Sequence, residues 1–123
     1  MRGGRWNAQG QEAIYTASTR ALAALEILVH YTVLPKGYLS TAVSVPASVS
    51  RTDLSGSGNR AQDPGWCRET GSRWLKQAAT AVLIVPSAIV PQERNYILNP
   101  AHPDFQKIDF GGAEPFLFDP RLK

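Results

Sequence analysis

The sequence predicts one mixed domain, either α/β or α+β, with five or six short strands flanked by helices. Residues 81–85 (AVLIV) form an unbroken apolar run without period-two alternation, which is typical of a strand buried on both faces. Residues 19–30 are apolar around nearly the whole helical circumference, which is typical of a buried helix. The remaining segments show neither regular βαβ alternation nor internal repeats, and 123 residues suffice for one domain with a core.

The first third of the chain predicts a loop, a strand and a helix. Residues 3–10 combine glycines with a cation, an aromatic ring and an amide, which suits a loop that passes close to another part of the molecule. Residues 13–15 form a short strand-like piece, and Ser18 or Thr19 can cap the helix that follows.

The middle of the chain predicts a half-buried strand and then a long surface excursion. Residues 38–45 alternate, and the face carrying Leu39, Thr41, Val43 and Val45 is expected to point inward. Residues 47–71 are rich in Ser, Gly, Arg, Asp and Asn, so we expect a loop. The glycines at 56–58 are not followed by a Lys-Ser/Thr pair and no strand precedes them, which argues against a phosphate loop.

The last third predicts a helix over residues 72–79 that leads into the buried strand 81–85. After it, residues 105–110 and 116–118 are expected to form two strands joined by a turn at Gly111-Gly112.

A polar cluster follows the buried strand and marks the candidate site. Pro86 and Pro91 bracket Ser87, so regular strand pairing should stop there. Glu93, Arg94 and Asn95 come next, and the end of a rigid buried strand positions such groups accurately.

Glu26 and His30 are the polar side chains in the body of the first helix, one turn apart on the same side. A carboxylate in such a helix is either paired with a structural Arg or functional, and the residues alone favour neither. For His30 the helix pattern favours a partner of the C-terminal helix dipole.

Composition argues against several classes of function. The 13 Lys and Arg against 10 Asp and Glu give a net charge of +3, and the charges are scattered, which argues against nucleic-acid binding. Cys67 is the single cysteine and there are two histidines, so no metal-ligand spacing is present and no internal disulfide can form. The N-terminus lacks the apolar region of a signal peptide and no run reaches the length of a membrane span, so we expect a cytoplasmic protein.

Several motifs together resemble the RES domain, the toxin of bacterial Xre–RES toxin–antitoxin systems. They occur in the family's order and spacing along essentially the whole chain: GGRWN at 3–7, IY at 14–15, LEILVH at 25–30, GSRWL at 71–75, VPSAIVPQERNYILNPAHPDF at 85–105 and FDPRL at 118–122. The resemblance implies an α+β, mostly antiparallel sheet core with flanking helices, similar to ADP-ribosyltransferases. It also implies a single domain over residues 1–123 that lacks an N-terminal segment of some tens of residues.

The resemblance further implies an activity and a site. NAD is bound as a substrate, with no separate cofactor and no metal, and its nicotinamide–ribose bond is cleaved. By position in the motifs, Glu26, Arg5 and Tyr15 are expected to be catalytic, and Ser87, Asn95 and Asn99 to bind substrate together with Arg5 and Tyr15.

The chemistry of such a cleavage fits these residue types. An oxocarbenium-like species needs a fixed anion, which Glu26 supplies, and the planar fork of Arg5 suits pyrophosphate oxygens. Tyr15 can stack on nicotinamide, and Ser87 is expected to orient the nicotinamide-ribose end.

The acceptor and the partners complete the expectations. Water as acceptor gives NAD hydrolysis and NAD depletion, which is the leading hypothesis, and a host protein as acceptor gives ADP-ribosylation. The competing hypothesis is a degenerate domain that only binds an antitoxin. The expected partners are NAD and an Xre-like helix-turn-helix antitoxin, with neither nucleic acid nor membrane, and a homodimer is compatible with the sequence.

Overall fold

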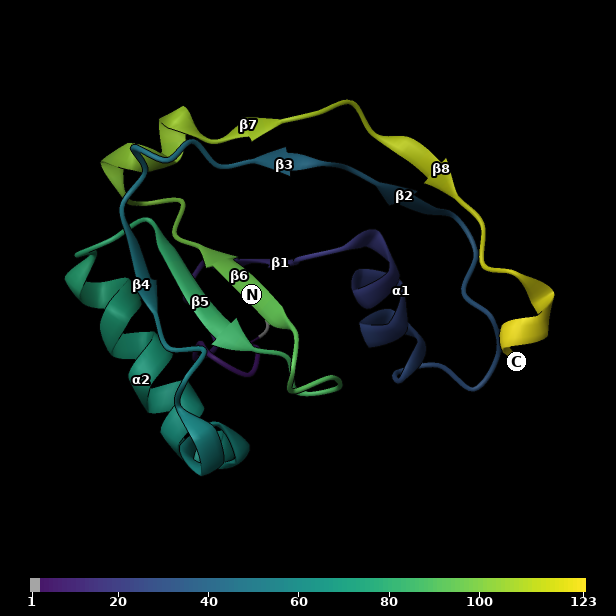
Figure 1. The fold of residues 1–123 in the computed structure, drawn as a ribbon, viewed down its shortest axis with the longest axis horizontal. Helices are drawn as coiled ribbons and strands as arrows, with labels where there is room; N and C mark the ends of the chain where they lie inside the picture. The colour runs from purple at the N-terminus through teal and green to yellow at the C-terminus, as the bar shows by residue number, and fades with distance from the viewer. Residues whose placement is uncertain (1–2) are drawn as a thin grey trace.

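The computed structural model describes residues 3–123, and its centre is a four-stranded sheet (Figure 1). The strand order is β1-β6-β5-β4, with bounds β1 Ile14–Ala17, β4 Arg51–Asp53, β5 Val82–Pro86 and β6 Arg94–Leu98. β1 pairs with β6 and β6 pairs with β5 in antiparallel fashion, whereas β4 and β5 are parallel. The predicted α+β class with a mostly antiparallel sheet is confirmed.

β5 is the buried strand that the apolar run predicted. Its residues Val82, Leu83 and Val85 have no exposed surface, because strands flank it on both edges and side chains cover both faces. The strand ends at Pro86, one residue before Ser87, as expected from the loss of a backbone donor at proline. Pairing of Val85 with Asn95 brings the polar segment of β6 to the same end of the sheet.

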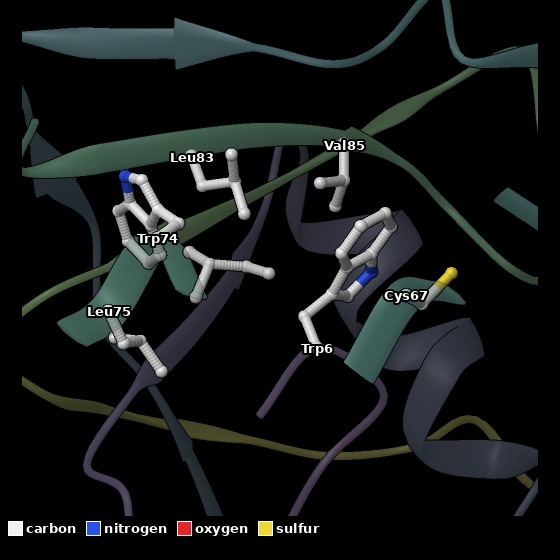
Figure 2. Packing of buried hydrophobic residues seen from close by; sticks show 7 residues of the cluster. Trp6, Cys67, Trp74, Leu75, Leu83 and Val85 are labelled. Carbon is white, nitrogen blue, oxygen red and sulfur yellow. The ribbon is translucent and has the colours of Figure 1, made fainter. Parts of the chain in front are cut away.

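The helix α2 (Pro64–Gln77) covers one face of this sheet. Asp63 caps its start by accepting a hydrogen bond from Gly65 N (2.9 Å), and Pro64 occupies a first-turn position where no donor is needed. Figure 2 shows the resulting core, in which the indole of Trp6 lies between Cys67 on α2 and Val85 on β5. The N-terminal loop is therefore part of the core.

The helix α1 (Arg20–Leu28) begins where the sequence predicted, but it is not buried all round. The Thr19 hydroxyl accepts the Leu22 N–H at 3.0 Å and caps the helix. Leu25 is 41% exposed and Val29 is 52% exposed, so the prediction of a buried helix is wrong. The physical reason is its place: α1 follows β1 at the margin of the sheet, and little of the described chain covers its outer face (Figure 1).

A long two-stranded ribbon crosses above the sheet (Figure 1). β2 pairs with β8 and β3 pairs with β7, and their bounds are β2 Tyr38–Ser40, β3 Val43–Ser44, β7 Asp109–Phe110 and β8 Glu114–Phe116. The expected turn at Gly111-Gly112 between two strands of a hairpin is wrong, because Gly111 N donates to Ala42 O (2.8 Å) and the chain runs on along the ribbon.

The expected single strand over 38–45 is interrupted, and its inward face is only partly right. Leu39 is 64% exposed, whereas Val43 and Val45 pack against the core. Residues 103–107 form a 3-10 helix, η2 (Pro103–Lys107), in place of the predicted first half of a strand.

The predicted surface excursion over 47–71 contains regular structure. It holds β4, a 3-10 helix η1 (Gly58–Gln62) and the first half of α2, so the helix expected over 72–79 begins earlier, at Pro64. The polar strand β4 was missed because it lies at the sheet edge, where apolar alternation is not required. A further 3-10 helix, η3 (Pro120–Leu122), ends the chain. Among residues 3–123, neither α-helix combines the length and the apolar character needed to traverse a bilayer.

Candidate active site

Glu26 on α1 points toward the end of β5 and β6, where two neutral donors hold its carboxylate. Ser87 Oγ donates to Glu26 Oε2 at 2.8 Å, and Asn95 Nδ2 donates to Glu26 Oε1 at 2.9 Å. Within residues 3–123 no Lys or Arg forms a salt bridge with Glu26, so the interpretation as a structural ion pair is not what the structure shows. The carboxylate is fixed in direction, and its negative charge is not neutralised by a cation of the described chain.

Ser87 is a support for Glu26. Its side chain is buried, with the residue 2% exposed, and its oxygen accepts the backbone N–H groups of Ile89 and Val90, both at 3.1 Å. Two accepted hydrogen bonds leave the hydroxyl proton to point at Glu26. The loop after Pro86 thus fixes the Ser87 hydroxyl as a hydrogen-bond donor to Glu26.

Asn95 links Glu26 to the first strand. Its Nδ2 donates both to Glu26 and to the backbone carbonyl of Thr16 on β1 (3.2 Å). Two acceptors on the same side determine which way the amide is turned, because its oxygen would be repelled there. The position of Glu26 therefore depends on the pairing of β1 with β6.

Arg5 and Tyr15 come from the N-terminal loop and from β1. Arg5 Nη2 donates to Ala61 O at 2.7 Å, which ties the loop to η1. The Tyr15 hydroxyl accepts Trp6 N–H (3.0 Å) and donates to Asn7 Oδ1 (2.5 Å). Burial raises the pKa of the Tyr15 hydroxyl, against a smaller lowering by the Trp6 N–H, so it stays protonated and remains a donor.

A cavity of about 700 Å³ opens between these elements and is the candidate substrate pocket. Four of the residues expected in the site line it together: Arg5, Tyr15, Glu26 and Asn95. Further walls come from residues 3–6 of the loop and residues 15–17 of β1. The rest come from α1, from Val29 and His30 just after it, and from the pair Ala88-Ile89 after β5. A smaller hollow of about 440 Å³ lies between α1 and the ribbon and adjoins the larger cavity, with which it shares Ala23, Ile27 and residues 15–17.

Two of the expected substrate-binding residues do not line this cavity. Ser87 lies behind Glu26. Asn99 follows the opposite end of β6 and is buried, where its Nδ2 donates to Leu75 O (3.3 Å) and its Oδ1 accepts Ala101 N–H (3.0 Å). The structure thus gives Asn99 contacts that hold the chain after β6 against α2.

Sequence reasoning did not single out Trp6 and Thr16, which line the cavity, or Asn7, which lies behind its wall. Trp6 is 3% exposed and Asn7 is 2% exposed. A usable signal was present in the GGRWN motif, because a tryptophan and an amide directly after a Gly pair are costly in a free loop and suggest anchoring.

The RES domain matches residues 1–119. The chain belongs to the RES family.

Curated relatives of this RES domain are named as toxins. It is 40% identical to "Prs ADP-ribosylating toxin" of Sphingobium sp. (strain YBL2), over 98% of this chain and 80% of that protein. It is 35% identical to "Toxin Res" of Pseudomonas putida KT2440, over 97% of this chain and 85% of that protein, and 37% identical to "Toxin Res" of Yersinia enterocolitica serotype O:8, over 98% and 84%.

The arrangement in this RES domain can stabilise a cation that develops inside the cavity. A carboxylate held through both oxygens cannot turn away, and its donors are neutral, so its field acts on whatever faces it. Arg5 supplies a positive charge on another part of the same wall, which suits an anionic group of the same ligand. A ligand with a cationic reacting centre and an anionic tail matches both.

Proposed function

We propose that this RES domain is a toxin that binds NAD in the 700 Å³ cavity and cleaves its nicotinamide–ribose bond. The observation that carries the proposal is the Glu26 carboxylate, held through both oxygens by Ser87 and Asn95 at the cavity wall. The cavity lies within the range of about 300–1,000 Å³ usual for small-molecule sites. The names of the curated relatives support the toxin assignment.

The reaction needs a fixed anion more than it needs a base. The bond from ribose C1′ to nicotinamide N1 breaks, the electron pair leaves with neutral nicotinamide, and positive charge develops on the ribose. Glu26 stabilises that charge without having to reorient, because its two hydrogen bonds are already made. The acceptor, which is water or a protein side chain, then attacks C1′ and releases its proton to solvent.

The other wall residues have distinct roles in this proposal. Arg5 binds the pyrophosphate, and the partly exposed ring of Tyr15 packs against nicotinamide, since its hydroxyl is already engaged by Trp6 and Asn7. Ser87 and Asn95 act through Glu26 by setting its direction.

The acceptor can be water or a protein, and both share the cleavage step. Transfer to a protein is favoured by the relative named "Prs ADP-ribosylating toxin", which is 40% identical over 98% of this chain. Hydrolysis would deplete NAD. Mass spectrometry separates the two, because hydrolysis yields free ADP-ribose and transfer yields a protein whose mass increases by one ADP-ribosyl group.

We also propose that this toxin acts in the cytoplasm and is restrained by an Xre-like helix-turn-helix antitoxin that covers the cavity. Val29 (52% exposed) and Ile89 (39% exposed) stand at the cavity wall and give such a partner apolar surface to cover. Purified antitoxin should suppress nicotinamide release. Binding that leaves nicotinamide release unchanged would count against a cover over the cavity.

The central experiment measures nicotinamide release from NAD by the wild type and by Glu26→Gln. Gln keeps the volume but removes the charge, so turnover should fall by ~10²–10³-fold while NAD binding changes little. Circular dichroism and thermal melting check that the variant is folded. Glu69→Gln is the matched control, because Glu69 lies exposed on α2 and should leave activity unchanged.

Arg5→Ala tests the other charge of the cavity wall. It should weaken NAD binding more than turnover, because the contact with pyrophosphate exists already in the ground state. A folded wild type that releases no nicotinamide would refute the enzyme and leave the binding-only hypothesis.

A further inference from the structure

The side chain of Asn7 is the centre of a hydrogen-bond network behind the cavity wall. Its Oδ1 accepts the Gly4 N–H at 2.8 Å and the Tyr15 hydroxyl at 2.5 Å, and its Nδ2 donates to Gln11 O at 2.9 Å. The residue is 2% exposed. Both ends of the amide are engaged, as a buried polar side chain requires.

Asn7 also closes the turn that carries Arg5. Gly4 N donates to Asn7 O at 3.1 Å, so Arg5 and Trp6 are the two central residues of a tight turn. Trp6 N–H in turn donates to the Tyr15 hydroxyl at 3.0 Å. The Arg5 turn and the Tyr15 hydroxyl are therefore joined in two ways, directly through Trp6 N–H and through the Asn7 amide.

The groups of this network are closely packed around Gly4. A Cβ placed at Gly4 would lie 2.6 Å from the Tyr15 hydroxyl oxygen and 2.8 Å from Asn7 Oδ1. Such separations are below ordinary contact distance, so only glycine lets the three groups approach. The separation between the turn and the tyrosine is thus set by direct contact.

We propose that Asn7 is a positioning residue for substrate binding: it holds Arg5 and the Tyr15 ring at a fixed separation on the cavity wall. Arg5 and Tyr15 line the cavity and Asn7 does not, so Asn7 acts through them. This inference rests on the proposed function, in which those two residues bind the two halves of NAD. A ligand held at two points binds more tightly when both binding residues are already in position, because less conformational freedom of the protein is lost on binding.

The test compares Asn7→Ala, Tyr15→Phe and the double variant in nicotinamide release. Asn7→Ala removes the Asn7 link, and Tyr15→Phe removes that link together with the acceptor of Trp6 N–H. The KM for NAD should therefore rise roughly tenfold in Asn7→Ala and at least as much in Tyr15→Phe, while kcat changes much less. The double variant should be no worse than Tyr15→Phe alone, because Tyr15→Phe already breaks the hydrogen bond to Asn7. Tyr15→Phe keeps the ring and so serves if Asn7→Ala does not fold.

Gln11→Ala is the control in the same loop. Its side chain accepts Ala8 N–H (2.9 Å) and donates to Ser72 O (3.4 Å), but it contacts neither the Arg5 turn nor the Tyr15 hydroxyl. It should lower thermal stability somewhat and leave the KM at the wild-type value. A wild-type KM in Asn7→Ala, an equal rise in Gln11→Ala, or additive effects in the double variant would overturn the positioning role.

A second readout separates this inference from the proposed function. Amide hydrogen exchange measured by NMR should show that Gly4 loses protection in Asn7→Ala, since its N–H donates to the Asn7 side chain, and that Trp6 loses protection in Tyr15→Phe, since its N–H donates to the Tyr15 hydroxyl. Lost protection with an inactive wild type would overturn the NAD reaction and the substrate role of Asn7 together. Retained protection with an active wild type would overturn the network alone.

Discussion

The Ser87 hydroxyl makes three hydrogen bonds, and together they fix the direction of its one proton. Two are accepted from Ile89 and Val90, and the third is donated to Glu26. A serine in this setting cannot turn its oxygen toward a ligand without leaving the Ile89 and Val90 amides without their acceptor. The contribution of Ser87 to chemistry is therefore expected to pass entirely through the carboxylate.

Ser87→Ala should lower kcat for nicotinamide release by roughly tenfold or more and change the KM for NAD little, because Glu26 loses one of two fixed donors. The two unpaired amides should also cost about 1–3 kcal/mol of unfolding free energy. Steady-state kinetics and urea unfolding measure the two effects separately. A large rise in KM with an unchanged kcat would instead make Ser87 a substrate contact.

Among the elements, the N-terminal loop and α2 approach each other most closely at Gly71. A Cβ at this position would lie 1.8 Å from the carbonyl oxygen of Trp6. Backbone atoms cannot yield as a flexible side chain does, so the loop would have to move off the helix. Trp6 belongs to the same core cluster as Cys67 and Val85, so the displacement would reach the core.

Gly71→Ala should therefore destabilise the fold by about 1–3 kcal/mol or more, the usual range for overpacking. Gly56→Ala is the control, because its added Cβ meets nothing within 4 Å and its backbone needs no left-handed conformation. Thermal melting of both variants checks the prediction. Equal melting temperatures would mean that the loop does not rest on α2.

A separate contact joins η2 to the segment before β4 and makes the fold sensitive to acid. Ser50 N–H donates to Asp104 Oδ2 at 3.0 Å, the Ser50 hydroxyl does so as well, and Lys107 lies 3.3 Å away. These bonds, the Ser50 amide first, lower the pKa of Asp104 to about 2. A carboxyl with a depressed pKa stabilises the fold above its unfolded value near 4, and this stabilisation is lost as the pH falls toward 2.

Asp104→Asn should consequently melt at a lower temperature than the wild type at pH 7, and the difference should shrink between about pH 4 and pH 2. The reason is that the wild-type carboxylate loses its charge over that range while the amide does not titrate. Thermal melting of both proteins at several pH values measures this difference. Asp109→Asn, an exposed change on β7, serves as the comparison. A gap that stays constant with pH would rule out the linkage.

At the scale of the whole molecule, the sequence correctly predicted the elements that depend mainly on residues close together in the chain. The apolar run 81–85 gave the central strand, because four successive buried residues leave no solvent face. The Thr19 cap gave the start of α1, because one hydroxyl satisfies the first-turn amide. Arg5, Tyr15, Glu26 and Asn95, which the family resemblance singled out, line one cavity, and their roles there stay predictions.

The parts that the sequence did not predict depend on distant partners. The pairing of β2 with β8 joins Tyr38 to Phe116, and no local period reports such a register. The exposed face of α1 has the same cause, since an apolar circumference does not say which neighbours will cover it. Asn99 matched a motif position, but the strand length of β6 separates it from Asn95 and the cavity.

Glu26 and its donors are far apart along the chain, so the ribosome makes them at different times. Ser87 lies 61 residues after Glu26, and Asn95 lies 69 residues after it. At about 5–20 residues per second, the ribosome makes Asn95 roughly 3–14 seconds after Glu26. Until then the carboxylate lacks the Asn95 donor and the strand β6, so a nascent chain that ends before β6 does not hold Glu26 as the folded domain does.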